Sequence, residues 1–200
     1  MSTWLLVGLG NPGPTYASHR HNVGYRVVDE LARRAGVRFT GAGQLRAETA
    51  QTRLTASGGM GAVGAEAEQI VLLKSRTFMN ETGIAVGKAS TYYKVPAERI
   101  VVVHDELDLD FGRLRVKFGG GDNGHNGLKS IRRSIGTGDF FRARFGVGRP
   151  PGRQDPADYV LSPFPAALAE DVAVEVARCA DAVQALLVLG LDEAQSRFNS

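Results

Sequence analysis

The sequence has little sulfur chemistry and no long hydrophobic run. Its 200 residues include one cysteine, Cys179, which excludes an internal disulfide and any metal site built on cysteine pairs. Cys179 lies in an amphipathic helical pattern, so we predict that it packs as a small core residue. The first apolar run, within MSTWLLVGLGNPG, is too short for a membrane span or a signal sequence, and no basic residues precede it. We therefore expect a cytoplasmic protein without a membrane partner.

Two common catalytic motifs are also missing. No G-x-S-x-G segment is present, so a serine nucleophile on a sharp strand-to-helix turn is not expected. The histidines do not form the helical H-x-x-x-H pair that a zinc hydrolase would use. We predict neither a metal nor a cofactor. A metal hydrolase built on His19, His21, His104 and His125 with nearby acids is one alternative, which insensitivity to chelators would exclude.

Short apolar runs alternate with amphipathic helical patterns along the chain. With 43% hydrophobic residues, the chain can bury a substantial core, and we predict one α/β domain over residues 1–200. Strands are expected at residues 3–7, 46–55, 70–74, 100–103, 113–117 and 141–148, with an edge strand at 159–161. Helices are expected from Asn22 to the break at Gly36, from residue 81 or 82, over 127–135 and after Pro165.

The most informative stretch is residues 100–127, IVVVHDELDLDFGRLRVKFGGGDNGHNG. Its first four apolar β-formers predict a buried strand that ends at His104-Asp105-Glu106, and open α/β folds place their sites at such sheet edges. Asp105 is our candidate for chemistry, because a histidine elsewhere in the chain lacks a partner. We interpret Glu106, Asp108 and Asp110 as a solvated turn. The glycines that follow predict a loop that backbone or ligand can approach closely.

The first strand leads into a loop, Gly8-Leu9-Gly10-Asn11-Pro12-Gly13-Pro14, which fits the dinucleotide-binding pattern G-x-G-x-x-G. A dinucleotide-binding oxidoreductase is therefore a second alternative. It is disfavoured because the prolines lack the backbone donors that a pyrophosphate needs, the helix begins well after the glycines and no acidic residue closes a second strand. We interpret the loop as a rigid corner that aims Asn11, Tyr16 and His21 across the strand ends.

Two further segments precede helices. His21 lies at the start of a helix, where the helix dipole disfavours the imidazolium, so we expect it to be neutral at working pH and able to accept a proton. A capping or packing role is the alternative for His21. In Phe78-Met79-Asn80, Met79 is predicted to be core, and Asn80 is either a helix cap or a functional residue.

Charge is unevenly distributed along the chain. Residues 113–153 hold ten Lys or Arg and two Asp, a local charge of +8, whereas residues 154–200 hold two Arg and eight acids, a local charge of −6. In FRARFGVG, residues 141–148, the alternation puts Arg142 and Arg144 on one exposed strand face. Two arginines there suit phosphates, so a polyanionic partner is predicted, with ordinary solvated charge as an equal alternative.

Taken together, these motifs resemble the bacterial peptidyl-tRNA hydrolase family. The matching segments are GLGNPG with Tyr16, RHNVG at 20–24, FMN at 78–80, HDELDL at 104–109, KFGGG and GHNG between 117 and 127, and FRARFGVG at 141–148. Each segment is weak alone, but the ordered set covers most of the chain. Asn123 departs from the pattern, because the family is expected to favour glycine there, and this predicts a slightly stiffer loop.

The resemblance implies a fold, a reaction and residue roles. The fold we expect is a single-domain three-layer sandwich, with a mixed, largely parallel twisted sheet flanked by helices. The reaction is hydrolysis of the ester between a peptide, or an N-blocked amino acid, and tRNA, which releases the tRNA for reuse in translation, and we expect a monomer to perform it. His21 would be the catalytic base, Asp105 its partner, and Asn11 would discriminate N-blocked from free aminoacyl groups. Substrate contacts would fall to Tyr16, Phe78, Asn80 and Asn126, and tRNA phosphate contacts to Lys117 and Arg144, with Arg142 beside them.

The same residues make a coherent hydrolase on chemical grounds. A neutral His21 takes a proton from water, while Asp105 orients the ring and stabilises the imidazolium that forms. An amide donor on Asn11, Asn80 or Asn126 stabilises the developing oxyanion, and the sequence leaves these three open. The remaining alternative is a non-catalytic RNA-binding protein on the same scaffold. It would keep the basic face, but the retained His21, Asp105 and Asn11 speak against it.

Overall fold

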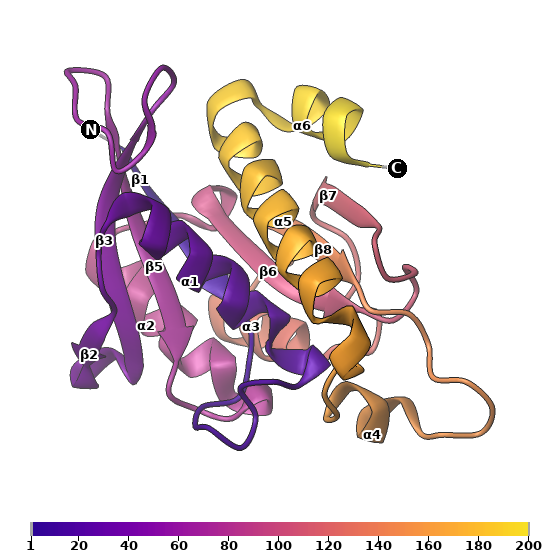
Figure 1. Cartoon of the computed structure of the whole chain (residues 1–200). Helices are drawn as coiled ribbons and strands as arrows, with labels where there is room; N and C mark the ends of the chain where they lie inside the picture. Colours follow the sequence, from indigo (N-terminus) through magenta and orange to yellow (C-terminus); the bar gives the residue numbers. More distant parts are fainter. Residues whose placement is uncertain (1, 200) are drawn as a thin grey trace.

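The computed structural model describes residues 2–199, which fold around an eight-stranded sheet (Figure 1). The strands are β1 (Thr3–Gly8), β2 (Thr40–Ala42), β3 (Ala47–Thr55), β4 (Gly59–Met60), β5 (Glu68–Ser75), β6 (Ile100–Glu106), β7 (Leu114–Phe118) and β8 (Phe141–Gly146). Their order is β2-β3-β5-β1-β6-β8-β7, and β4 pairs with β3. The four central strands β5, β1, β6 and β8 are parallel, with antiparallel strands on either side.

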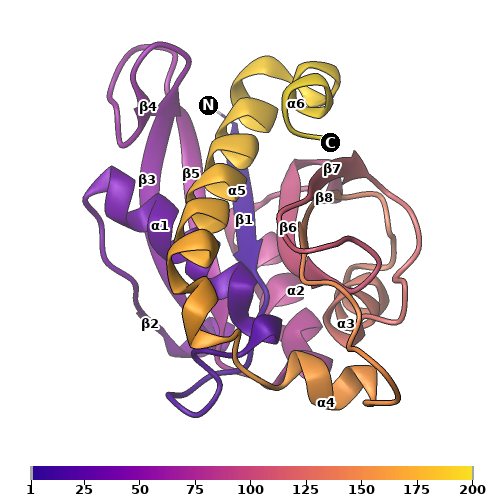
Figure 2. The same ribbon diagram turned by 45° about the vertical axis from the view of Figure 1, so that its right-hand side comes forward.

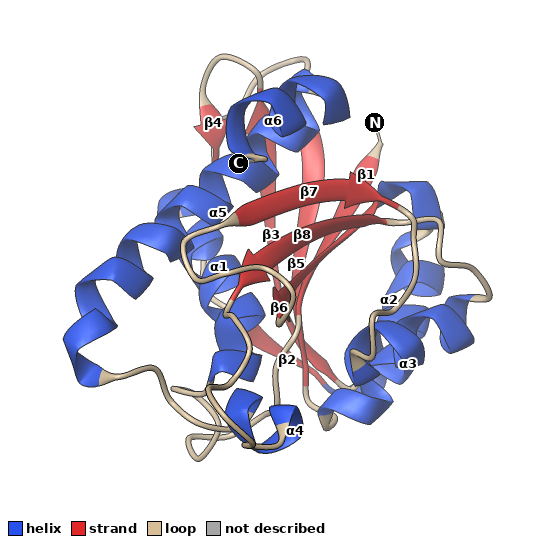
Figure 3. Cartoon of the chain, turned by 90° about the vertical axis from the view of Figure 1, so that its right-hand side faces the viewer, coloured by secondary structure: helices blue, strands red, loops and turns tan. Residues whose placement is uncertain are grey.

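Helices cover both faces of this sheet. The α-helices are α1 (Val23–Ala35), α2 (Thr82–Tyr93), α3 (Asn126–Ile135), α4 (Pro156–Val160), α5 (Ala169–Leu189) and α6 (Leu191–Phe198); short 3-10 helices are η1 (Arg20–Asn22), η2 (Gly43–Leu45), η3 (Met79–Glu81), η4 (Ala97–Arg99) and η5 (Ala166–Leu168). Figure 3 shows α1 and α5 on one side of the strands and α2 and α3 on the other. The predicted three-layer α/β sandwich is confirmed. No helix among the described residues combines the length and the apolar composition that crossing a membrane requires.

The central strands are buried on both faces, which explains their nearly continuous apolar sequences. Alternate residues serve two cores: Leu6 and Val103 pack with α1 and α5, whereas Leu5 and Val102 pack with α2 and α3. Cys179 on α5 belongs to the first core, as predicted, and burial raises the pKa of its thiol to about 12. Polar chemistry is thereby confined to the strand ends.

Helix α1 starts directly against the ends of β1 and β6. A Cβ atom on Gly24 would lie 2.3 Å from the carbonyl oxygen of Val103, and one on Gly8 would lie 2.3 Å from the carbonyl oxygen of Gly24. Any larger residue at either position would push the helix away from the sheet. The two glycines therefore set the height of η1, which carries His21, above the end of β6.

The segment before α5 differs from the prediction. Residues 159–161 do not form an edge strand, because Pro156–Val160 is the short helix α4. Asp155 caps α4 by accepting a hydrogen bond from the Ala157 amide at 2.9 Å, and Pro156 occupies its first turn. Figure 2 shows α4 at the end of the molecule opposite α6. The guanidinium of Arg20 ties this segment to η1 by donating to Ser162 Oγ at 2.7 Å and stacking 3.9 Å from the Tyr159 ring centroid.

Candidate active site

A pocket of about 520 Å³ opens where the carboxyl ends of β1, β5 and β6 meet the start of α3 and one side of α4. Six of the predicted site residues line it: Asn11, His21, Phe78, Asn80, Asp105 and Asn126. Three of the remaining four, Lys117, Arg142 and Arg144, come from β7 and β8. The fourth, Tyr16, lies at the rim, with its ring centroid 6.1 Å from that of Phe78.

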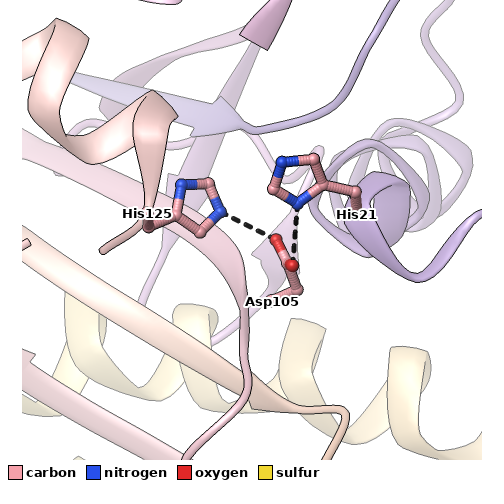
Figure 4. Close-up of side chains that lie close together, drawn as sticks. All are labelled: His21, Asp105 and His125. Carbon is pink, nitrogen blue, oxygen red and sulfur yellow. Dashed lines mark hydrogen bonds and ion pairs between the residues drawn. The ribbon is translucent and has the colours of Figure 1, made fainter. Parts of the chain in front are cut away.

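Asp105 is the centre of the pocket floor. It is the last residue but one of β6, is 3% exposed, and has a histidine nitrogen at each carboxylate oxygen (Figure 4). His21 Nδ1 lies 2.8 Å from Oδ2, and His125 Nε2 lies 2.8 Å from Oδ1. The predicted pairing of His21 with Asp105 is present in the structure, and His125 is an additional partner that the sequence did not identify.

The hydrogen bonds assign a proton to each ring. An ionised carboxylate can only accept, so His21 carries its hydrogen on Nδ1, and the neutral ring keeps the Nε2 lone pair available to a water molecule. His125 donates through Nε2, and its Nδ1 accepts the Gly127 amide at 3.1 Å. Both nitrogens of His125 are therefore occupied. His21 is the ring in this trio that can take a proton.

The close contacts in this trio shift the pKa values of Asp105 and His21. Burial favours a neutral Asp105, but the charges of His21 and His125 and their hydrogen bonds outweigh it and hold the pKa of Asp105 well below its usual value. Burial also opposes protonation of His21, but the charge and hydrogen bond of Asp105 outweigh that effect, so the pKa of His21 is raised. The helix-dipole argument predicted that the imidazolium of His21 is disfavoured, whereas the carboxylate of Asp105 shifts the pKa of His21 in the opposite direction.

A third ring supports the trio from below. His104 is 1% exposed, its Nδ1 donates to the backbone carbonyl of Asp105 at 2.8 Å, and its ring centroid lies 5.2 Å from that of His125. Burial and the neighbouring His125 lower the pKa of His104 to about 3. His104 therefore stays uncharged in the neutral pH range and acts as a packing partner of His125.

Asn11 is held rigidly at the end of β1. Its backbone N–H donates to Asn22 Oδ1 at 3.0 Å, Asn22 Nδ2 donates back to the Asn11 carbonyl at 2.9 Å, and Asn11 Oδ1 accepts the Met79 amide at 2.8 Å. Among the described residues, Asn11 Nδ2 has no hydrogen-bond partner. Turns follow the loop, and η1 begins only at Arg20, so the glycines do not open a helix as a dinucleotide site requires.

The predicted substrate contacts lie around the pocket rim. Met79 is 5% exposed and belongs to the core, as predicted. Asn80 does not cap a helix, because the N-cap residues of η3 and α2 are Phe78 and Glu81. Asn80 is exposed, as is Asn126 at the start of α3. Both side chains line the pocket, and neither residue is the N-cap of a helix.

Two expectations about charged residues are wrong. Glu106 is not in a solvated turn: it is 3% exposed and accepts a hydrogen bond from Arg144 Nη2 at 3.0 Å. Arg142 is not on an exposed face, because its side chain is completely buried. The Arg142 guanidinium donates to the carbonyls of Gly120, Gly121 and Gly138. Arg142 therefore holds the glycine-rich loop and does not present its charge to a phosphate.

Lys117 and Arg144 remain near the surface of the β7–β8 face. Both are partly exposed, and Lys117 pairs in register with Arg142, two residues from Arg144 along β8. Burial, together with the positive charges of Arg144 and Arg142, lowers the pKa of Lys117. A bound anion would be attracted to these neighbouring positive charges.

His21, Asp105 and His125 are also the described residues with the donor types for a metal ion, and their possible ligand atoms lie within 4.8 Å of one another. Two imidazole nitrogens and a carboxylate suit zinc. However, the nitrogens that face Asp105 are the ones already hydrogen-bonded to it at 2.8 Å. A metal would have to displace both hydrogen bonds, so it competes with the arrangement that activates His21.

Known proteins share this sequence and architecture. The family model described as peptidyl-tRNA hydrolase matches residues 5–200. A peptidyl-tRNA hydrolase of Cutibacterium acnes is 55% identical over 198 residues, which cover 99% of this chain and 98% of the relative. One from Streptomyces coelicolor is 51% identical over 98% of this chain and 95% of the relative.

Solved structures agree with the sequence comparison. A crystal structure of peptidyl-tRNA hydrolase from Acinetobacter baumannii superimposes with a TM-score of 0.82 at 32% identity, over 99% of this chain and 95% of that one. A complex of peptidyl-tRNA hydrolase with N-propanol gives a TM-score of 0.85 at the same identity and coverage. The resemblance found in the sequence motifs is confirmed, and so is the enzyme class it implies. By sequence and by structure, the chain belongs to the peptidyl-tRNA hydrolase family.

Proposed function

We propose that His21 and Asp105 carry out the hydrolysis of peptidyl-tRNA in this member of the family. The observation that supports this assignment most directly is the 2.8 Å hydrogen bond that leaves His21 Nε2 free at the pocket. His21 takes a proton from water, the water attacks the ester carbonyl, and Asp105 stabilises the imidazolium that forms. The proton then passes to the ribose oxygen as the ester bond breaks, which restores neutral His21.

Three asparagines serve the peptide end of the substrate in this proposal. Asn11 offers Nδ2 to the carbonyl that an N-blocked amino acid has and a free one lacks, because its Oδ1 is already taken by Met79. Asn80 and Asn126 are exposed at the pocket and supply amide donors for the developing oxyanion. Phe78 and Tyr16 provide an aromatic rim for the chain that enters.

Lys117 and Arg144 bind a phosphate of the tRNA in the same proposal. They lie together on the β7–β8 face, and the exposed bases Lys129, Arg132 and Arg133 continue the positive charge onto α3. Phosphate contacts add affinity and set orientation without reading bases, which suits an enzyme that accepts many tRNAs.

We further propose that residues 1–200 act as one domain, as a monomer and in the cytoplasm. The residues of the proposed site all lie on or beside one sheet, which supports a single domain. Peptidyl-tRNA arises where translation takes place, and this supports the cytoplasm as the location of the enzyme. A monomer peak in light scattering, unchanged by the addition of tRNA beyond the mass of one complex, tests the oligomeric state.

The decisive experiment measures release of N-acetyl-aminoacyl groups from tRNA by the parent protein and by His21→Ala. Unblocked aminoacyl-tRNA is the control for substrate choice, and EDTA is the control for a metal. We expect rapid cleavage of the blocked ester only, unaffected by EDTA and lost in His21→Ala.

Each other outcome has a defined meaning. Loss of activity in EDTA, restored by zinc, would move the assignment to a metal site at His21, Asp105 and His125. Full activity in His21→Ala would remove this residue as the base. Absence of cleavage with intact tRNA binding would favour a non-catalytic RNA-binding protein.

A further inference from the structure

Asn123 occupies an unusual backbone position in the glycine-rich loop. Its φ is 50°, a left-handed value that its neighbours Gly119, Gly120 and Gly124 also adopt. Glycine takes this conformation without strain, whereas a residue with a side chain does so at some energetic cost, which is smallest for asparagine. The contacts of the Asn123 side chain show what offsets this cost.

The Asn123 amide joins two acidic side chains. Nδ2 donates to Glu106 Oε1 and, at 2.6 Å, to Asp108 Oδ2. An amide nitrogen has two hydrogens, so this contact uses both. Asn123 thus ties the loop to the turn that follows β6, and it holds two carboxylates of like charge side by side.

An arginine lies at each end of this arrangement. Arg144 Nη2 donates to Glu106 Oε1 at 3.0 Å, and Arg149 Nε donates to Asp108 Oδ1 at 2.8 Å. The result is a charge-balanced chain from the β7–β8 face to the pocket wall, in the order Arg144, Glu106, Asn123, Asp108 and Arg149. Glu106 is 3% exposed, and a buried carboxylate is stable only where donors satisfy it.

We propose that Asn123 is a positioning residue for tRNA binding: it fixes the Glu106 carboxylate and, through it, holds the Arg144 guanidinium ready for a phosphate. The inference rests on the proposed function, in which Arg144 contacts tRNA phosphate. A side chain that is ordered in advance loses less conformational entropy when its ligand binds. Without the amide, Glu106 loses one of its two donors, and Arg144 loses a fixed partner.

The hydrogen bonds that hold His21, Asp105 and His125 in place do not involve the side chain of Asn123. His125 donates its backbone N–H to the Asp122 carbonyl at 2.9 Å and its Nε2 hydrogen to Asp105, and neither contact involves the Asn123 side chain. His21 is likewise bonded to Asp105 alone among the described side chains. Removal of the Asn123 amide should therefore change KM for tRNA substrates and leave kcat unchanged.

The test begins with Asn123→Gly, which keeps the left-handed backbone and removes only the amide. We expect KM for N-acetyl-aminoacyl-tRNA to rise about three- to tenfold, the range for one hydrogen bond of ordinary strength, with kcat within about twofold of the parent. Asn123→Asp should raise KM further, because it places a third carboxylate beside Glu106 and Asp108. The matched control is Lys94→Gly, an exposed residue with a φ of 55° at the end of α2, which should leave both constants unchanged.

A double-mutant cycle separates positioning from a general loss of structure. In an Arg144→Ala background, Asn123→Gly should add less than about twofold to KM, since the two residues act as a unit. If the two effects multiply in full, or if Asn123→Gly lowers kcat with KM unchanged, the inference is wrong. If Arg144→Ala weakens tRNA binding and Asn123→Gly does not, only the inference fails. If Arg144→Ala itself leaves KM unchanged, the proposed phosphate contact fails with it.

Discussion

At the scale of single residues, the site depends on which partner each polar atom has. Asp105 accepts from two histidines, yet only His21 keeps a nitrogen free, because His125 spends its second nitrogen on the Gly127 amide. The same reasoning separates Arg142 from Arg144. They share a strand face, but the Arg142 guanidinium donates to carbonyls of the loop, whereas Arg144 stays partly exposed and donates to Glu106.

The first prediction concerns pH. The neutral form of His21 is the base, so kcat/KM should rise with pH through a midpoint above the ordinary imidazole value of 6.5, because Asp105 raises the pKa of His21. Asp105→Asn removes that charge, so the midpoint should move down, and the rate should fall by about 10²- to 10⁴-fold. Rate profiles from pH 5 to 9 measure both effects. A midpoint that is the same in parent and variant would contradict the pairing.

The same ion pair links stability to pH. The folded pKa of His21 lies above its unfolded value. The stability that comes from protonated His21 is therefore fully present below the unfolded pKa and is lost as the pH rises through the folded pKa. The parent should lose more stability than Asp105→Asn over this interval. Thermal melts of both proteins across it provide the measurement, and parallel curves would show that His21 is not charge-coupled to Asp105 in the folded state.

The third prediction concerns Arg142. Arg142→Met keeps the apolar stem but leaves the carbonyls of Gly120, Gly121 and Gly138 without their donor. We expect the free energy of unfolding in urea to fall by about 2 to 4 kcal/mol, since each buried unsatisfied group costs roughly 1 to 3 kcal/mol. Arg115→Met, on the neighbouring strand and exposed, should change it by less than about 0.5 kcal/mol. Equal effects of the two substitutions would show that Arg142 is not the anchor of the loop.

At the scale of elements, close backbone contacts fix the helices that carry the site. Helix α3 begins at Asn126, directly after His125, and packs against α2. At the crossing, a Cβ atom on Gly83 would lie 2.1 Å from the carbonyl oxygen of Ser130, and the Gly83 amide donates to Ser130 Oγ at 2.8 Å. The position of α3, and with it the position of Asn126 at the pocket, therefore depends on Gly83 of α2.

The fourth prediction compares two glycines of α2. Gly83→Ala should force α2 and α3 apart, lower the free energy of unfolding by about 1 to 3 kcal/mol, as overpacking does, and reduce activity. Gly87→Ala, one turn later, meets nothing closer than Ser134 Cβ at 3.7 Å, so it should be neutral or stabilise the helix by about 0.5 to 1 kcal/mol. Urea unfolding and turnover of both variants decide the point. Tolerance of Gly83→Ala would show that the crossing of α2 and α3 does not require a glycine at this position.

At the scale of the whole molecule, charge is segregated in space as well as along the chain. The basic residues of β7, β8 and α3 surround the β7–β8 face, whereas the acidic residues of 154–200 lie mainly on α5 and α6. The sheet separates α2 and α3 from α1 and α5 (Figure 3). A polyanion is thus attracted to one side of the molecule, and this orients it before contact.

The fifth prediction tests this separation of charge. The logarithm of the tRNA association constant should fall linearly with the logarithm of salt concentration, and Arg144→Ala should reduce the slope by about 1, as the loss of one phosphate contact does. Arg33→Ala removes the same charge from exposed α1, on the opposite side of the sheet, and should leave the slope unchanged. Equal slopes for parent and Arg144→Ala would show that the RNA lies elsewhere.

The sequence by itself determined the fold class and which residues reach the sheet edge. Both follow from local patterns, because apolar runs define buried strands and abrupt polar ends such as His104-Asp105-Glu106 define where the strands stop. The period of two also placed Arg142 and Arg144 on the same face. What periodicity cannot give is which part of a face is covered by other segments.

The tertiary structure decided the partners. His125 comes to Asp105, Asn22 to Asn11 and Glu106 to Arg144 only because distant segments meet at the carboxyl ends of parallel strands. The direction of the His21 pKa shift and the burial of Arg142 depend on those same long-range contacts. Electrostatic and hydrogen-bond energies act over a few ångströms in space, whatever the separation along the chain, and so the chemistry of this site was settled by packing.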